Sequence, residues 1–387
     1  MRGVSVIGVG STRFGRHGET SIEDLGIEAA ADAIMDAGLD RREIGALYLG
    51  NFVAGSLTGQ EVLAGLVADG LGLENIPCTK VEGACASGGI AFRHAWLSIA
   101  SGLCDAALVV GVEKMTHASS PQVTGALNAA MDNAGDGPSG LSFPGLFGLA
   151  FREHQKRYGT TRRQLSSVVI KNKGNGLRNP LAQMGKELTP EIVEQSVPIA
   201  DPLLLYDCCP VSDGAAALIL VADDRAGAAP RLPIRIKAAV QTRGAGRIAG
   251  HPDLLTFEAT VEAARRAYHQ AGLGPRDLDF VELHDCFSIA EIIDAEDLGI
   301  VPRGQGGGWA EEGRTRVDGD MPINPSGGLL SKGHPVGATG VGQLYEAVKQ
   351  LRGEHPNQVK DAAVGLTHNL GGTGIACTVS ILTRPDA

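Results

Sequence analysis

The chain has 387 residues, of which 43% are hydrophobic, 54 are glycine and only 4% are aromatic. This length exceeds one ordinary domain and predicts two or more core units. The composition is typical of a tightly packed α/β protein with many close turns. A formal net charge of -10 argues against a nucleic acid or an anionic membrane as a partner of the whole protein, so an anionic ligand would need a local basic patch.

The seven cysteines are an odd number and show no paired spacing. The N-terminal stretch reads as a strand and not as a signal peptide, so we expect reduced thiols and a cytoplasmic location. The longest apolar runs, residues 106–112 and 215–222, are too short to cross a bilayer. Both fit buried parallel strands.

Strands alternate with helices along the first part of the chain, which predicts a mostly parallel sheet covered on both faces. Ser21 fits a helix cap, and that helix should end near Gly38. The other expected elements are strand 4–9, strand 46–50, helix 60–71, helix 86–102 and strand 106–111.

Residues 37–49 align without gaps on residues 271–283. In both segments a helix ends at Ala-Gly-Leu, a short turn follows and a strand begins. The second copy continues in step, with a Gly333-His334-Pro335 turn where the first copy has Cys85, and then strand 362–366. We therefore predict two homologous halves related by a pseudo-twofold axis. Residues 226–233 are the expected linker between them.

An insert, residues 116–207, fits neither half. It contains a Gly/Ser/Asn-rich loop and then, from Arg152 to Arg178, eight Lys or Arg residues against one acid. Such a run is commonly a solvated helix face. In an acidic chain it is equally a candidate cradle for a phosphorylated ligand.

Cys85 lies in a turn of small residues, Glu82-Gly83-Ala84-Cys85-Ala86-Ser87-Gly88, just ahead of an apolar-periodic helix. A helix N-terminus favours a thiolate. A single cysteine is more often a small buried hydrophobe. Three distant stretches that contain glycine and histidine, near residues 284, 334 and 368, favour a nucleophile with a base instead.

These four stretches, in this order, resemble the thiolase superfamily over essentially the whole chain. His284-Asp285-Cys286-Phe287 is most similar to the sterol-carrier-protein type and archaeal-type thiolases. The resemblance implies an α/β thiolase fold, with two βαβαβαββ halves in a layered α/β/α/β/α arrangement and an inserted loop domain. The N-terminal half would be residues 1–115 and 208–230, the loop domain 116–207 and the C-terminal half 231–387.

The same resemblance implies roles for individual residues. Cys85 would be the nucleophile and His334 its base, with His284 and His334 forming an oxyanion hole for an enolate. A second hole would use the Cys85 N–H and an N–H near Leu370 or Gly371. Cys286 would move the alpha proton, with His368 as its rival, while Asn369 is a candidate oxyanion or supporting residue. Structural roles are expected for the remaining cysteines, Cys78, Cys104, Cys208, Cys209 and Cys377.

The implied activity is that of an acetyl-CoA C-acyltransferase: thiolytic cleavage of a 3-oxoacyl-CoA, or the reverse Claisen condensation, without a metal or redox cofactor. The CoA candidates are Arg152, Arg157, Arg178 and Ser212, and a homodimer or homotetramer is expected. Leu146-Phe147-Gly148 and Asp207-Cys208-Cys209-Pro210 depart from the common thiolase pattern beside the acyl pocket. The sequence therefore leaves open whether the substrate carries a longer, branched or aryl-substituted acyl chain.

Two alternatives remain at this stage. The first is a thiolase-like subunit that acts on acyl-CoA and needs a small zinc-ribbon/OB-fold partner. It would be a branched or aryl 3-oxoacyl-CoA thiolase, a carbon-carbon lyase or a lipid-transfer protein. The second is a decarboxylating ketoacyl synthase that uses His284 or Asn369, which leaves Cys286 without a role.

Overall fold

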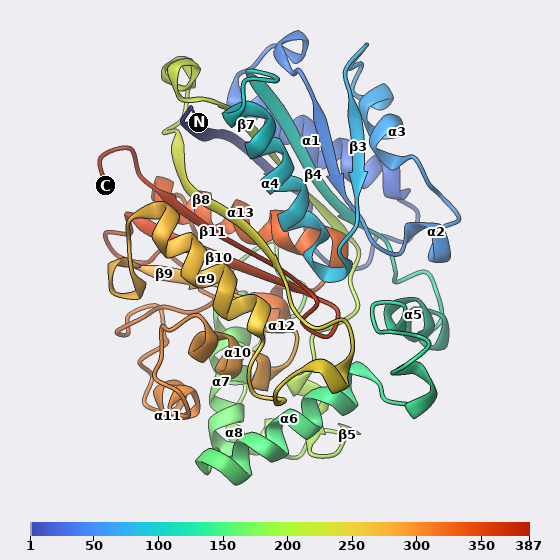
Figure 1. Cartoon of the computed structure of the whole chain (residues 1–387), viewed down its shortest axis with the longest axis vertical. Coiled ribbons are helices and arrows are strands. Elements are labelled where there is room, and N and C mark those ends of the chain that lie inside the picture. The colour runs from blue at the N-terminus through green and yellow to red at the C-terminus, as the bar shows by residue number, and fades with distance from the viewer. Residues whose placement is uncertain (1) are drawn as a thin grey trace.

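The structure is a computed structural model that describes residues 2–387. Its strands form one large mixed sheet with helices on both faces and a separate two-stranded sheet in the insert (Figure 1). The strands are β1 (Val4–Ser11), β2 (Leu47–Gly50), β3 (Cys78–Val81), β4 (Ala106–Glu113), β5 (Pro198–Ala200), β6 (Leu203–Leu204), β7 (Gly214–Ala222), β8 (Ile234–Arg243), β9 (Phe280–Glu282), β10 (Val364–Gly371) and β11 (Ala376–Thr383). The helices are α1 (Ile22–Ala37), α2 (Ala54–Leu57), α3 (Leu63–Gly70), α4 (Ser87–Ala100), α5 (Ser120–Asn128), α6 (Phe143–Tyr158), α7 (Arg162–Arg178), α8 (Pro190–Glu194), α9 (Glu258–Ala271), α10 (Ser288–Asp297), α11 (Gly306–Glu311), α12 (Gly328–Lys332) and α13 (Val336–Arg352).

Local signals place the first elements where the sequence predicts them. The Ser21 side chain accepts the Asp24 N–H at the start of α1, and Gly38 ends the helix in the left-handed conformation at φ +61°. Helices α3 and α4 and strands β1, β2 and β4 match the predicted segments, with ends shifted by a few residues.

The strand order shows the two halves directly. The large sheet runs β3-β2-β4-β7-β1-β8-β11-β10-β9. Counted outward from the central β1–β8 pair, β7 corresponds to β11, β4 to β10 and β2 to β9. An isolated parallel bridge between Val281 and Ile323 lies beside β9, in the place that β3 takes beside β2. The predicted pseudo-twofold arrangement is therefore present in the sheet.

The predicted strand directions are partly wrong. Strand β2 is parallel to β3 and β4, and β9 is parallel to β10, but every pair from β4 to β10 across the centre is antiparallel. Strand β7 is parallel to neither of its neighbours. Only residues 372–375 separate β10 from β11, and such a short connection cannot cross over to a parallel position.

Helices form layers on and between the two halves of the sheet. Helix α1 packs on β1, β4 and β7, whereas α4 and α13 pack on one another and on strands of both halves (Figure 1). Helix α9 packs on β8 and β11. Alternate residues of β7 enter the hydrophobic cluster under α1 and the cluster around α4 and α13. The central helices therefore bring their N-terminal ends together from the two halves.

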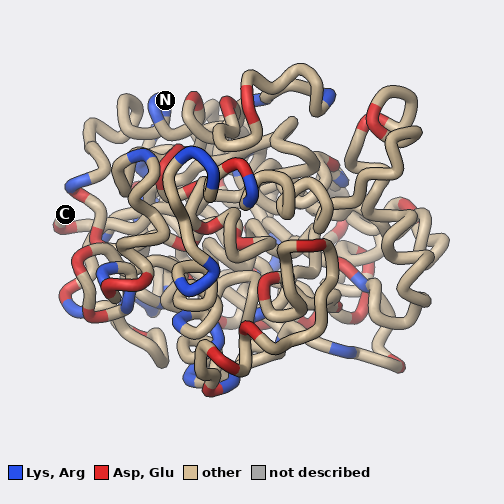
Figure 2. The backbone as a smooth tube through the Cα atoms, turned by 90° about the horizontal axis from the view of Figure 1, so that it is seen from below, with Lys and Arg blue, Asp and Glu red and all other residues tan. Residues whose placement is uncertain are grey.

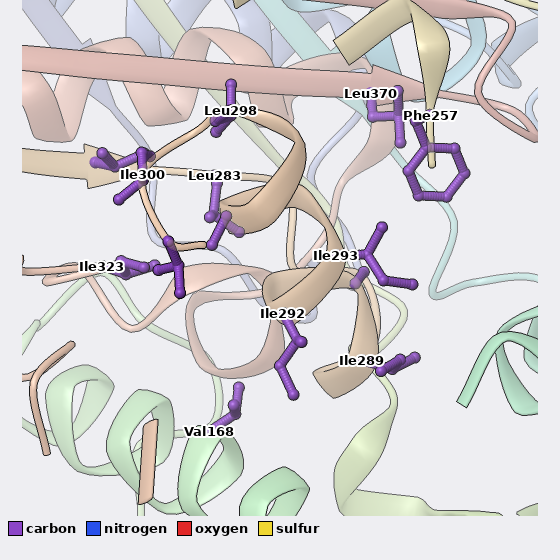
Figure 3. Close-up of a cluster of buried hydrophobic side chains, with 14 of the residues drawn as sticks. Val168, Phe257, Leu283, Ile289, Ile292, Ile293, Leu298, Ile300, Ile323 and Leu370 are labelled. Atoms are coloured by element: carbon purple, nitrogen blue, oxygen red, sulfur yellow. The ribbon is translucent and has the colours of Figure 1, made fainter. Parts of the chain in front are cut away.

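The insert packs against the second half. Helix α7 contacts α10, α11 and α12, and α6 contacts α10. Figure 3 shows Ile289, Ile292 and Ile293 of α10 among buried neighbours that include Val168 of α7 and Leu370 of β10. Fully burying one such side chain stabilises the fold by about 1.5–3 kcal/mol. This core fixes the turn between β9 and α10, which carries His284 and Cys286. Among residues 2–387, no helix combines the length and the apolar character that crossing a bilayer requires.

Candidate active site

The Cys85 turn joins β3 to α4 and is held by Ser87. The Gly83 N–H donates to Ser87 Oγ at 3.0 Å, and that hydroxyl donates to the Ala84 carbonyl at 2.6 Å. Ala84 has a φ of +51°, in the left-handed region that residues other than glycine rarely adopt. Strain of this kind persists where the surrounding structure fixes it, and it is common at active sites.

Glycines allow the two halves to approach closely at this turn. A Cβ on Gly371 would lie 2.2 Å from the Gly83 carbonyl oxygen, and a Cβ on Gly88 would lie 2.8 Å from the Gly337 carbonyl oxygen. Strand β10 and helix α13 of the second half therefore reach the Cys85 turn of the first. The role of Gly371 is to let strand β10 approach the Cys85 turn this closely.

Cys85, His284 and His334 meet at this junction. Their sulfur and ring nitrogen ligand atoms lie within 4.8 Å of one another. The two imidazole rings are nearly perpendicular, at 82°, with ring centroids 4.9 Å apart. A thiol and two imidazoles thus converge from three segments that are far apart in the sequence.

The hydrogen bonds of His334 indicate which ring nitrogen is free. Thr339 Oγ1 donates to the Pro335 carbonyl at 3.1 Å and therefore accepts from His334 Nδ1 at 2.7 Å. With the proton on Nδ1, the neutral ring has a lone pair on Nε2. The backbone N–H of His334 donates to Ser212 Oγ at 3.0 Å, so Ser212 supports this turn. His334 can act as a proton acceptor.

His284 has the opposite tautomer. Asn369 Oδ1 accepts from the Gly89 N–H at 3.3 Å, which orients the amide. Asn369 Nδ2 then donates to the Cys85 carbonyl at 2.9 Å and to His284 Nδ1 at 3.2 Å. Because Nδ1 accepts, the proton of neutral His284 is on Nε2. His284 is therefore a hydrogen-bond donor, whereas His334 is an acceptor.

Burial keeps these groups neutral. It lowers the pKa of His334 to about 3 and that of His284 well below its usual value. Burial also raises the pKa of Cys85 to about 12, although the N–H groups of Gly372 and Cys85 lower it. Desolvation outweighs these donors, so the thiol rests protonated. The sulfur must lose its proton during the reaction.

We expect kcat/KM to show no acid limb near pH 6.5, the ordinary pKa of histidine. The pKa of His334 is lowered, so its neutral, proton-accepting form persists as the pH falls. The test is a profile of kcat/KM between about pH 5 and 7, with protein folding followed in parallel. A limb with an apparent pKa near 6.5 in folded enzyme would contradict this assignment.

Two further thiols lie beside the site. The Cys209 N–H donates to the Cys286 carbonyl at 3.1 Å, and burial raises the pKa of both thiols well above the usual range, with Cys85 adding to the shift. Cys208 and Cys209 both line the cavity beside His334, which is where the sequence analysis places the segment that contains them. The structural role predicted for these two thiols stays a prediction.

His368 lies behind His284. Its Nε2 is 3.0 Å from Thr260 Oγ1, and its Nδ1 accepts the His284 N–H at 3.4 Å. Burial lowers the pKa of His368 to about 3. Both ring nitrogens are thus engaged away from Cys85. His368 supports the His284 backbone, and Cys377 lies fully buried on β11 near Thr260.

A cavity of about 360 Å³ opens beside His334. Phe287, Val336 and Met184 supply apolar walls, and Lys173 and Cys209 also line it. Phe147 is outside this lining and stacks on Phe287 with ring centroids 4.6 Å apart. Of the two segments that depart from the common pattern, the one containing Cys209 borders the cavity directly.

The candidate CoA arginines have protein partners. Arg152 pairs with Asp201, Arg157 contacts Glu153 and Asp253 at 3.0 and 2.7 Å, and Arg178 donates to Asn357 at 3.1 Å. Arg178 lines a separate groove of about 1070 Å³ beside α7 and α11. In Figure 2, which views this end of the molecule, basic and acidic segments are interspersed. The phosphate cradle stays a prediction.

Sequence reasoning missed Glu113, at the end of β4. The carboxylate is fully buried and accepts four N–H groups, which come from Phe52 N, Val53 N, Gly337 N and Asn51 Nδ2 at 2.9, 3.2, 3.1 and 2.7 Å. Burial raises the pKa of Glu113 to about 7, and these donors lower it. Because Gly337 belongs to the first turn of α13, Glu113 positions the helix that follows His334.

Replacing Glu113 with glutamine should lower the free energy of unfolding by about 2 kcal/mol or more, because an amide NH₂ would face N–H donors. Chemical denaturation measures this change. The matched control is Glu74→Gln, which alters an exposed glutamate. Equal stabilities of the two variants would contradict the assigned role of Glu113.

The group of Cys85, His284 and His334 is also the set that could hold a metal ion, since each residue offers one ligand atom. Sulfur and imidazole ligands suit Zn²⁺, whereas Mg²⁺ prefers oxygen. We expect Zn²⁺ to inhibit by occupying the nucleophile, a chelator to restore activity, and Mg²⁺ to have no effect. Activity assays and direct Zn²⁺ binding test this, and a His284→Ala variant with unchanged Zn²⁺ affinity would contradict it.

Comparisons with known proteins agree with this arrangement. The sequence profiles "Thiolase, N-terminal domain" and "Thiolase C-terminal domain-like" match residues 4–200 and 241–384. An acetyl-CoA acetyltransferase of Methanothermobacter thermautotrophicus is 47% identical over 385 residues, covering 99% of this chain and 100% of that protein. Sterol carrier protein 2 of Bos taurus is 36% identical over 401 residues, covering 99% and 73%.

Solved structures share the fold. A structure named "Ltp2-ChsH2(DUF35) aldolase" has a TM-score of 0.85 and 26% identity, and the match covers 99% of this chain and 98% of that one. The two family profiles together, and each of the two relatives, extend over most of the sequence. The resemblance drawn from the sequence motifs is thereby confirmed, and the chain belongs to the thiolase family of acyltransferases.

Proposed function

We propose that the protein transfers an acyl group between CoA thioesters through a thioester on Cys85. The convergence of the Cys85 thiol with a proton-accepting His334 and a proton-donating His284 carries this proposal. A covalent intermediate divides a difficult acyl transfer into two easier steps. The acetyl-CoA acetyltransferase relative supports the same reaction class.

In the thiolytic direction, Cys85 gives its proton to His334 Nε2 as the sulfur attacks the 3-oxo carbon. The N–H groups of Cys85 and Gly372, which both lower the pKa of the thiol, are placed to stabilise the oxyanion that forms. The second N–H was expected near Leu370 or Gly371, and Gly372 is the next residue along. Breaking the carbon-carbon bond then leaves the acyl group on Cys85 and releases an enolate.

We assign stabilisation of that enolate oxygen to His284 Nε2–H, since Asn369 holds its other nitrogen as an acceptor. Cys286 gives the proton that converts the enolate into an acyl-CoA. His368 is the weaker candidate for this transfer, because Thr260 and the His284 backbone occupy its ring nitrogens. In the second step the CoA thiol gives its proton to the Cys286 thiolate and attacks the acyl-Cys85 carbonyl. The Cys85 sulfur then leaves and takes back the proton held by His334, so that both thiols are restored.

These steps use only CoA and groups of this chain, so we propose no resident metal or redox cofactor. They need reduced Cys85 and Cys286, which favours a reducing compartment such as the cytoplasm. The test is incubation of purified protein with acetoacetyl-CoA and CoA, with acetyl-CoA measured by chromatography. CoA-dependent formation with ping-pong kinetics would support the proposal, and absence of turnover with every 3-oxoacyl-CoA would overturn it.

We also propose a homodimer or homotetramer, the default for soluble oligomers, with acyl-CoA esters as ligands. A small zinc-ribbon/OB-fold subunit is the second proposed partner. Its support is the similarity, at a TM-score of 0.85, to a structure whose name joins Ltp2 with ChsH2(DUF35). Analytical ultracentrifugation measures the oligomeric state and so tests the first of these proposals. Full thiolase activity of the isolated chain would show that catalysis needs no second subunit.

A further inference from the structure

Four lysines are nearly fully buried, and one of them differs from the rest. Lys114, Lys171 and Lys332 lie 3.9, 2.7 and 2.6 Å from carboxylates of Asp213, Glu291 and Glu346. Lys173 is the most buried of the four, at 2% exposure, and within residues 2–387 it has no carboxylate within 4 Å. Buried charges in proteins are normally paired.

Lys173 lies on α7, where its ammonium donates to the Leu330 carbonyl. An ammonium has three donors, and this carbonyl is the one acceptor it contacts in the described part of the chain. The side chain lines the cavity of about 360 Å³ that also borders His334. Donors remain for a ligand in that cavity.

Burial lowers the pKa of Lys173 to about 8, and nearby Lys186 lowers it further. Cys209 and Asp285 act in the opposite direction. The side chain is therefore mostly a cation near neutral pH, although the adjoining walls include Phe287, Met184 and Val336. A carboxylate on a ligand would supply the missing partner through a charge-assisted hydrogen bond.

We infer that Lys173 binds a carboxylate on the acyl chain, so that the preferred substrates are CoA thioesters of dicarboxylic acids and the corresponding 3-oxoacyl esters. This inference rests on the proposed acyl transfer through Cys85. The nucleotide phosphates of CoA are the wrong occupant, because Lys173 shares its cavity with His334, where the reacting carbonyl must lie. Lys173 would be a specificity-determining residue.

The test compares the rates at which CoA esters acylate Cys85 in the wild-type protein, measured by quenched intact-protein mass spectrometry. The probes are succinyl-, glutaryl- and adipyl-CoA, each paired with a neutral isostere that carries an isopropyl group in place of the carboxylate. For the chain length that reaches Lys173, the carboxylate ester should react at least about tenfold faster, since a tenfold ratio needs only a modest binding difference.

Two variants assign that preference to one side chain. Lys173→Met keeps much of the side-chain volume and should bring the ratio close to one while acylation by acetyl-CoA continues. Lys360→Met removes the charge of an exposed lysine that does not line this cavity, and it should leave the ratio unchanged.

Equal wild-type rates for carboxylate and isopropyl esters at every chain length would overturn the inference, and this comparison needs no variant to fold. An equal loss for both kinds of ester in Lys173→Met would overturn it too, because Lys173 would then contact a part of CoA that all esters share. If acetyl-CoA acylates Cys85 but no carboxylate ester is preferred, only this inference is refuted. If no ester acylates Cys85, the proposed function is refuted as well.

Discussion

Replacing Cys85 with serine should eliminate the acyl-enzyme and lower turnover by at least about four orders of magnitude, the range found for catalytic nucleophiles. A serine hydroxyl is a much weaker nucleophile at neutral pH, and His334 is too weak a base to ionise it fully. Steady-state rates with acetoacetyl-CoA and intact-protein mass measure the two effects.

Cys104→Ser is the matched control for that variant, because Cys104 lies in the loop between α4 and β4, away from His284 and His334. It should retain wild-type turnover. A Cys85→Ser protein that keeps more than about one per cent of wild-type turnover would contradict the nucleophile assignment.

Replacing His334 with asparagine should lower kcat/KM by about 10²–10⁴, the usual contribution of a general base. Alkylation of Cys85 by iodoacetamide should also slow, because burial raises the pKa of this thiol to about 12 and Nε2 of His334 is its proton acceptor. Thr339→Val removes the hydroxyl that accepts from Nδ1 and donates to the Pro335 carbonyl, but it keeps the imidazole and should cost less, about tenfold.

His269→Asn alters an exposed histidine on α9 and serves as the control for both measurements. It should leave the alkylation rate and kcat/KM unchanged. A folded His334→Asn variant that alkylates Cys85 at the wild-type rate would show that another group accepts the proton.

The family, the two halves and the meeting of Cys85 with His284 and His334 could be predicted from sequence because each rests on a local motif or a repeat. The ring tautomers could not. Thr339 is near His334 in the chain, but its role depends on the Pro335 carbonyl. Asn369 contacts the Cys85 carbonyl across 284 residues, so only the tertiary structure shows that it fixes His284 as a donor.

Strand direction escaped prediction for a physical reason. Strands β4 and β7 are buried on both faces, so each reads as a continuous apolar run. That pattern reports burial and carries no information on whether a neighbour is parallel. The chain leaves the end of β4 into the insert and returns to the same end at β7, which makes the pair antiparallel.

The basic run of the insert shows a similar limit. Its sequence shows eight cations and one acid, Glu153, which pairs with Arg157, but the other carboxylates that pair with the run come from outside it. Arg162 binds Asp207 through two contacts of 2.6 Å, and Lys171 pairs with Glu291. The folded chain neutralises much of the run. Among its cations that lack a carboxylate partner within residues 2–387, Lys173 is the buried one, and the sequence does not show which cations are buried.

The most direct test of the account is intact-protein mass spectrometry after incubation with acetyl-CoA and a panel of 3-oxoacyl-CoA esters, followed by peptide mapping. Acyl transfer through Cys85 predicts one acyl group per chain, carried on Cys85, and its removal when CoA is added. An adduct that maps to Cys286 or Cys209 instead, or a folded protein that forms no adduct with any ester, would contradict acyl transfer through Cys85.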